Sequence, residues 1–266
     1  MNPLAKGHAS LREGLLIAVL GVVGLFAAPA MAAEALNPDA DEILRSMSKF
    51  LASTKTFSVS ADISNELVTI DTQKLQLNGH ATLVVERPSR LYAARQGKFA
   101  DAEFFFDGSK LTIYGKSLQG YVQQDVAGTI DQAITAIELA SGLSMPGADL
   151  LFSDPYAVLS SGIRSSGYYG MAYVAGVRCH HLAFRTATVD WQIWVKDGDE
   201  PLPMKYVITS KRVAMSPQYS VVLSNWNTKP TIAANRFQFV APPGARKLQG
   251  LSVDETGEIT TSEEGK

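Results

Sequence analysis

The spacing of apolar residues changes along the chain from a helical period to a strand period. Over residues 37–54 (NPDADEILRSMSKFLAST) apolar side chains return every three or four positions, which predicts an amphipathic helix with Asn37 as N-cap and Pro38 in its first turn. From Phe57 onward the period is two, since Phe57 and Val59 alternate with serines. The sequence therefore predicts a helix followed by strands that each bury one face.

A hairpin is expected at the Asp107–Gly108 pair, because this dipeptide suits a turn with positive φ. Glu103, Phe105 and Asp107 share one face of the first hairpin strand, so Phe104 and Phe106 are expected to point to the core. Strand patterns before the hairpin lie at 75–77, 83–85 and 91–93. In the segment 81–86 the alternation does not decide which face is buried.

The middle of the chain returns to helical spacing. Residues 129–141 predict a helix with Thr129 as cap and with Ile130, Ile134, Ile137 and Leu139 on one side. A second, short helix is expected at 155–159. Strand patterns then resume at 166–174, 177–185, 189–196, 204–209 and 219–226, with a last short strand at 237–239.

The order of these elements favours an α+β fold with an antiparallel sheet, because no strand–helix–strand alternation is present. Nine to eleven strands are close to the number at which a twisted sheet curls. The concave side of such a sheet must be filled, and two helices with apolar stripes are available to fill it. We therefore expect a strongly curved antiparallel sheet with helices packed in its concave face, and an apolar pocket between the two.

The first 32 residues have the layout of a secretory signal peptide. Lys6 and Arg12 precede an apolar run over residues 14–28, and small residues follow up to residue 32. We expect removal of residues 1–32 and a periplasmic location in a Gram-negative bacterium; an uncleaved N-terminal anchor is the alternative. The rest of the chain is interpreted as one domain over 33–248 and a polar, disordered tail over 249–266.

Composition excludes some classes of protein. A net charge of −2 gives no electrostatic basis for binding nucleic acid or an anionic membrane. The single cysteine, Cys179, rules out a disulfide within the chain, so the stability of the fold is expected to come from its core.

No pattern of catalytic residues stands out, and we expect neither an enzyme nor a cofactor. On a strand, Cys179 and His181 share a face and His180 points away; a metal site would need further ligands such as His80, so no metal is expected. Asp190 is expected to pair with Lys205 or Arg185 across strands. The three tryptophans, at positions 191, 194 and 226, fit a ligand pocket and a plain core equally well.

Several motifs late in the chain carry a family resemblance. They are Gly-x-x-Cys-x-His-Leu from Gly176, Asp-Trp-Gln-Ile-Trp at 190–194, Leu-Pro-Met-Lys at 202–205 and Phe-x-Phe-x-x-Pro-Pro-Gly-Ala at 237–245. Over residues 37–248 the chain resembles a family of predicted periplasmic proteins with no assigned function, which is similar in layout to the LolA/LolB lipoprotein-carrier superfamily. The resemblance implies an eleven-stranded half-barrel with helices as a lid over an apolar cavity.

The chain departs from the superfamily in two respects that bear on function. First, the sequence does not place the arginine that LolA has near its cavity mouth, and Arg87 and Arg90 are only candidates for it. The chain also lacks the cysteine that carries the lipid anchor of LolB. These departures leave the lipoprotein-shuttle role itself open.

Two functions follow from this sequence interpretation. The first is a periplasmic binding or carrier protein that holds a hydrophobic ligand, such as a lipid, an acyl chain or a lipoprotein anchor, between sheet and helices. The alternative is a protein-interaction or envelope-stress sensing module without a ligand. The expected partners are a hydrophobic small molecule or lipid and an envelope protein, with no nucleic acid and no stable membrane insertion after signal cleavage. The candidate cavity residues are Phe104, Phe106, Leu111, Ile113, Trp191, Ile193 and Tyr206.

Overall fold

The computed structural model describes residues 36–98, 101–141, 145–253 and 259–261. The chain divides into a unit of residues 1–33 and a unit of residues 34–266, and all the described residues belong to the second unit. The signal peptide expected at 1–32 lies outside the described residues. Among the described helices, none combines the length and the apolar content that crossing a membrane requires.

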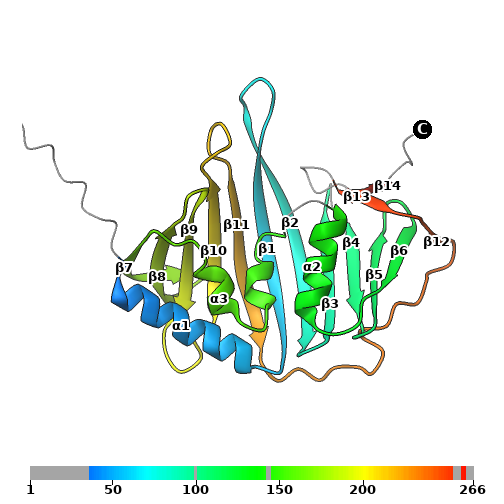
Figure 1. The fold of residues 1–266 in the computed structure, drawn as a ribbon, viewed down its shortest axis with the longest axis horizontal. Helices are drawn as coiled ribbons and strands as arrows, with labels where there is room; N and C mark the ends of the chain where they lie inside the picture. Colours follow the sequence, from blue (N-terminus) through cyan, green and yellow to red (C-terminus); the bar gives the residue numbers. More distant parts are fainter. Residues whose placement is uncertain (1–35, 99–100, 142–144, 254–258, 262–266) are drawn as a thin grey trace, which may run out of the picture. The chain divides into compact units, whose positions relative to one another are not determined.

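A single open sheet of twelve strands forms the body of this unit (Figure 1). The strand order is β12-β6-β5-β4-β3-β2-β1-β11-β10-β9-β8-β7, and every pairing is antiparallel except the short parallel pair of β12 with β6. The strands are β1 (Thr56–Val68), β2 (Lys74–Glu86), β3 (Arg90–Gly97), β4 (Ala102–Phe106), β5 (Lys110–Gly115), β6 (Gly120–Asp125), β7 (Ser165–Val174), β8 (Val177–Arg185), β9 (Val189–Lys196), β10 (Pro203–Ser210), β11 (Gln218–Asn227) and β12 (Arg246–Lys247).

The helices lie across one face of this sheet (Figure 1). They are α1 (Pro38–Ser53), α2 (Ile130–Ser141), the 3-10 helix η1 (Ala148–Leu151) and α3 (Pro155–Leu159). The Asn37 side chain accepts a hydrogen bond from the Ala40 N–H at 2.9 Å, so the predicted cap of α1 is confirmed. The expected α+β class, with a curved open sheet and helices on one face, is confirmed as well.

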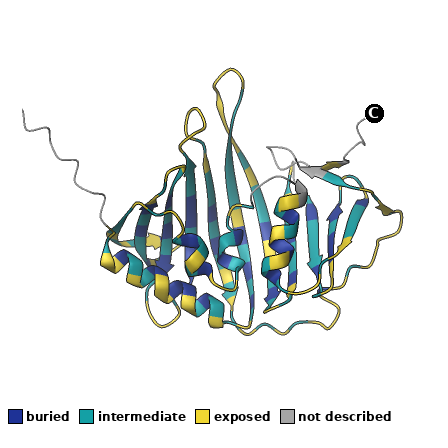
Figure 2. Ribbon diagram, viewed as in Figure 1, coloured by how far each residue is buried: buried dark blue, intermediate teal, exposed yellow. Residues whose placement is uncertain are grey.

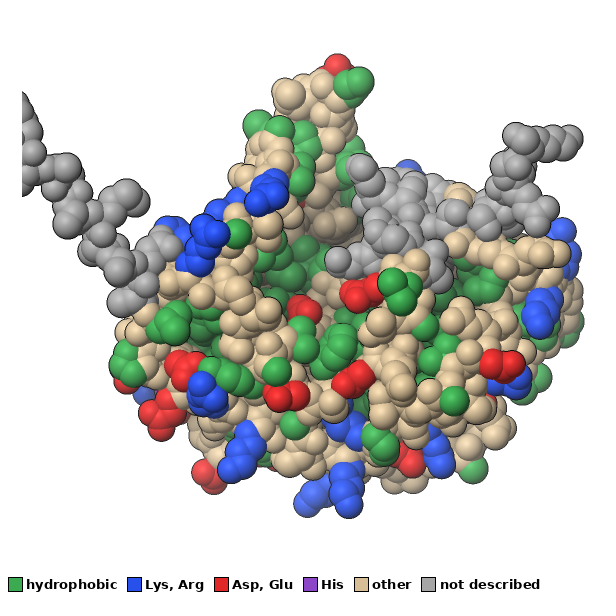
Figure 3. All heavy atoms as spheres, viewed as in Figure 1, with side chains coloured by type: hydrophobic (Ala, Val, Ile, Leu, Met, Phe, Trp, Pro, Cys, Tyr) green, Lys and Arg blue, Asp and Glu red, His purple; other side chains and the backbone are tan. Residues whose placement is uncertain are grey.

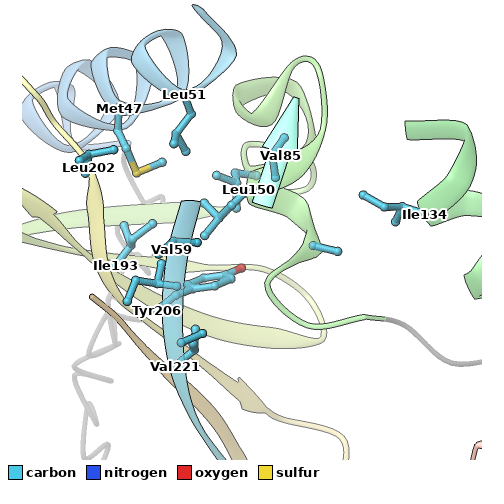
Figure 4. Close-up of a cluster of buried hydrophobic side chains, with 14 of the residues drawn as sticks. Met47, Leu51, Val59, Val85, Ile134, Leu150, Ile193, Leu202, Tyr206 and Val221 are labelled. Atoms are coloured by element: carbon cyan, nitrogen blue, oxygen red, sulfur yellow. The ribbon is translucent and has the colours of Figure 1, made fainter. Parts of the chain in front are cut away.

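We call the helix-covered side of the sheet the inner face and the opposite side the outer face. The main core fills the space between the helices and the inner face (Figures 2 and 4). From α1, Leu44, Met47 and Leu51 are at most 1% exposed. Phe57 stands opposite Val85 in the β1–β2 pair. The sequence left open which face of residues 81–86 is buried, and this pairing shows that the Val85 side faces the core.

The strand predicted at residues 237–239 is wrong. The segment is a turn followed by coil on the outer face, where the Phe239 ring packs against Phe105, Tyr114 and Tyr121 with centroids 4.8–5.8 Å apart. Two aromatic residues separated by one position are typical of a strand, but the same pattern occurs in a coil segment whose rings pack onto a sheet. The sequence pattern therefore does not distinguish the two.

Two further differences concern the helix α2 and the tail. Ile130 and Ile134 of α2 are buried, whereas Leu139 is 80% exposed, because nine residues at 100° each place Leu139 opposite Ile130. Within the tail predicted to be disordered, β13 (Leu251–Val253) pairs with β14 (Ile259–Thr261) as a separate two-stranded sheet.

Candidate ligand-binding site

All seven residues expected to line a cavity lie on the inner face, in or against the main core. Phe106, Leu111, Trp191, Ile193 and Tyr206 are at most 5% exposed. Phe104 and Ile113 are only partly buried and stand directly opposite each other on β4 and β5. The first group is therefore sealed beneath other side chains, while Phe104 and Ile113 keep surface that a ligand could contact.

The inner face is hollowed where the helices do not cover it. Figure 3 shows the hollow below the two raised hairpins, β1–β2 and β10–β11, with hydrophobic side chains gathered in it. Partly buried apolar residues that adjoin the core, such as Ile63, Leu83 and Ile208, lie on these central strands. The hollow is thus continuous with the core and has an apolar floor.

Arg87 ties the segment between α2 and α3 to the sheet. It follows β2, and its Nη1 donates hydrogen bonds to the carbonyl oxygens of Leu151 and Phe152 at 2.7 and 3.1 Å. Its guanidinium carbon lies 5.9 Å from the centroid of the Phe57 ring. Burial lowers the pKa of Arg87, and Asp131 on α2 partly offsets this shift. Arg90, the other arginine considered, is exposed and pairs with Glu86.

Acidic groups near the hollow already have hydrogen-bond donors. The Tyr206 hydroxyl donates to Asp149 of η1 at 3.4 Å, and burial raises the pKa of both groups. The Glu138 side chain accepts the Met145 N–H at 3.1 Å. Each carboxyl group therefore has a donor within the protein.

Among the described residues of the inner face, Arg95 and Tyr219 have donor groups without an acceptor. Arg95 stands opposite Ala81, and Ala81 stands opposite Ala61 of the core, so register places Arg95 on the inner face. Its Nε is buried without a hydrogen-bond partner. Tyr219 packs against the same core, and burial raises its pKa to about 12. In the part of the chain that the structure describes, neither Arg95 nor the Tyr219 hydroxyl makes a hydrogen bond.

Sequence reasoning missed Arg95 and Tyr219, although the sequence contains a signal for the first. In β3, Leu91, Ala93 and Arg95 alternate onto one face, so a charged residue continues an apolar series. A charge on the buried face of a strand is costly without a partner, which makes it a candidate for function.

The cysteine and histidines do not form a common site. Cys179 lies buried on the outer face of β8, and His181 stacks on Trp194 with ring centroids 4.2 Å apart. His80 pairs with Asp62 at 2.7 Å on β2, and four strands separate β2 from β8. No group of three or more metal-ligating side chains occurs among the described residues.

The remaining candidates have structural partners. Asp190 pairs with Arg185 at 3.4 Å, as expected, and with Lys211 at 3.0 Å rather than with Lys205. Lys205 instead lies 5.0 Å above the Trp194 ring, because β10 places it beside that residue on the outer face. Trp191 is buried in the main core, stacked on Phe184 at 4.1 Å, and the partly buried Trp226 packs against Phe57 of the same core with ring centroids 5.5 Å apart.

Cys179 is expected to react slowly with thiol reagents while the protein is folded. Its side chain is 0% exposed, and burial raises the pKa of the thiol, so little thiolate is available. With a disulfide reagent at neutral pH we expect labelling at least about 100-fold slower than in denaturant. Tyr173→Cys on neighbouring β7, at a position 72% exposed, is the control and should add one rapidly reacting thiol. Equal rates for both thiols would contradict the buried position.

Fold and site together define a protein with an open, curved antiparallel sheet and helices over a hollowed apolar face. The chain belongs to the family described as "Predicted periplasmic protein (DUF2092)", whose model matches residues 40–250. This match confirms the family resemblance and the periplasmic location expected from the sequence. No curated protein matches the sequence.

Several solved structures are similar to this chain. An uncharacterized conserved protein from Thermus thermophilus has a TM-score of 0.46 at 9% identity, with 79% of this chain and 98% of that chain covered. LprF from Mycobacterium bovis has a TM-score of 0.44 at 12% identity, covering 74% and 97%. A LolA superfamily protein from Nitrosomonas europaea has a TM-score of 0.36 at 10% identity, covering 75% and 97%.

Proposed function

We propose that this protein binds and carries a hydrophobic ligand in the periplasm, held between the inner face of the sheet and the helices. The observation that carries the proposal is the hollow with its apolar floor, where side chains adjoining the core remain partly exposed. A concave apolar site that the helices leave partly open is the usual form of a site for an apolar ligand.

Phe104 and Ile113 are the candidate contact residues within reach of such a ligand. The other five residues belong to the buried part of the main core: Phe106, Leu111, Trp191, Ile193 and Tyr206. A ligand that penetrates to this second group requires the helices to move outward. The proposal assigns the chain a binding role and no catalytic step.

Binding of a fluorescent fatty acid by the protein recovered from the periplasm tests this function. We expect saturable binding, and organic extraction of the same protein is expected to release a lipid detectable by mass spectrometry. Phe104→Ala should weaken binding about tenfold, because it removes apolar contact area from the site.

The matched control is Phe105→Ala, one residue along the same strand. Phe105 lies on the outer face, where it packs against Tyr92 and Phe239, so its loss should leave ligand affinity unchanged while lowering stability. A protein that binds no lipid probe and yields no lipid on extraction would contradict a carrier. That result would favour the alternative of an interaction or sensing module.

A further inference from the structure

The inner face carries a charged group whose presence an apolar ligand alone does not explain. Arg95 is half-buried, its Nε is closed off from solvent, and no carboxylate or carbonyl oxygen of the described residues accepts from it. Removing the Nε–H of a cation from water without supplying an acceptor costs free energy. Replacement by an apolar residue of similar length would remove this cost, so the fold itself does not require the guanidinium.

The position of Arg95 places it beside the hollow. Its strand neighbours on the inner face are Ala81 and Ala102, which are too short to cover it. The guanidinium leans over Gly79 of β2, where a β-carbon would lie 3.8 Å from the Arg95 Nε. Gly79 in turn stands opposite Ile63, on the apolar floor of the hollow.

Tyr219 supplies a second donor on the same face. It stands opposite Asn65 on β1, two positions from the Ile63–Val221 pair along the same strands. Its ring is close enough to Arg95 for each to influence the pKa of the other. Its hydroxyl reaches toward η1, since it lies 3.6 Å from where a β-carbon of Gly147 would be. A guanidinium and a phenol thus lie on the same face of the sheet within electrostatic reach of each other, and neither has an acceptor among the described residues.

The nearby acids do not neutralise this pair. Asp149 accepts a hydrogen bond from the Tyr206 hydroxyl, and it makes none with Arg95 or Tyr219 among the described residues. Burial raises the pKa of Asp149, and the Glu138 carboxylate adds to this shift, so the charge of Asp149 is disfavoured. Among the described residues, Arg95 and Tyr219 are thus left with free donor groups, while Asp149 and Glu138 already accept hydrogen bonds from within the protein.

We propose that Arg95 and Tyr219 bind the anionic head group of the ligand, so that the protein selects single-chain amphiphiles with a carboxylate or phosphate over neutral ones. The head group accepts hydrogen bonds from the guanidinium and the phenol, and the acyl chain lies along the apolar floor toward Phe104 and Ile113. This inference rests on the proposed function, since it names the chemistry of the ligand that the same hollow holds.

The test compares oleate, oleyl phosphate and oleyl alcohol, three probes that share one chain and differ in the head group. Affinities are measured below the micelle concentration by displacement of a fluorescent fatty alcohol from the protein recovered from the periplasm. Wild type is expected to bind the two anions about 10- to 100-fold more tightly than the alcohol, which is the usual effect of a charge-assisted hydrogen bond in a buried site. A preference between oleate and oleyl phosphate would identify the source of the anion.

Variants assign this preference to the two side chains. Arg95→Met should abolish the preference for anions and leave the affinity for oleyl alcohol unchanged, whereas Arg95→Lys should retain part of it. Tyr219→Phe, which removes the hydroxyl alone, should lower the affinity for anions several-fold. Arg90→Met is the matched control, because Arg90 is exposed on the same strand, and it should change neither affinity.

Stability serves as a second measurement, since Arg95→Met is expected to unfold at the same temperature as wild type or higher. Equal binding of oleate by wild type and Arg95→Met, or equal binding of oleate and oleyl alcohol by wild type, would overturn the inference and leave the carrier function intact. Binding of none of the three probes would overturn both.

Discussion

Ile134→Ala is expected to lower the free energy of unfolding by about 2–5 kcal/mol, because it removes three buried methyl or methylene groups and leaves a cavity. Ile134 is 1% exposed and lies in the core between α2 and the sheet (Figure 4). Denaturant unfolding, followed by tryptophan fluorescence, gives the measurement, with the slope of the transition as a check on two-state behaviour.

Leu139→Ala on the same helix is the control for this substitution. The Leu139 side chain is 80% exposed, so its truncation should change the free energy of unfolding by no more than about 0.5 kcal/mol. Equal losses for the two variants would show that α2 does not present the Ile134 side to the sheet. They would also remove the basis for placing the helices over the inner face.

Arg87→Met is expected to lower the free energy of unfolding by about 1–3 kcal/mol, because the carbonyl oxygens of Leu151 and Phe152 lose their shared donor. The loss should be local: residues 145–160, which include η1 and α3, should exchange their amide hydrogens faster while α1 and β8 keep their protection. Hydrogen exchange followed by mass spectrometry resolves these segments.

The comparison variant here is Arg90→Met, three residues further along the chain. Arg90 is exposed and pairs with Glu86, and a surface ion pair of this kind rarely contributes more than about 1 kcal/mol. We expect little change in stability and no faster exchange in 145–160. Faster exchange in both variants, or in neither, would show that the hydrogen bonds of Arg87 do not hold η1 and α3 against the sheet.

Much of the fold could be predicted because period and burial agree along most strands. Phe57 and Val59 fall on the inner face as their alternation with serines requires. The cap at Asn37 follows from its side chain and from the proline after it. The short parallel pairing of β12 with β6 could not be predicted, since two residues are too few to show a period.

The candidate site was predictable only in its apolar part. The spacing of Phe104 and Ile113 assigns them to one face, and the structure places them opposite each other. Arg95 and Tyr219 come from strands β3 and β11, which are more than 100 residues apart in the chain and are brought together by the pairing of β1 with β11. The spacing of residues along the sequence does not show that Arg95 and Tyr219 lie near each other in the fold.

The pairing of β1 with β11 also sets the order in which this protein can fold. Strands β1 to β6 each pair with the next strand in sequence, so they can form early. Strands β7 to β11 form a second series of the same kind. The junction between the series joins Ser58 to Asn227, so a very long loop must close before the floor of the hollow exists. A chain synthesised or translocated from its N-terminus therefore completes the hollow only after β11 has emerged.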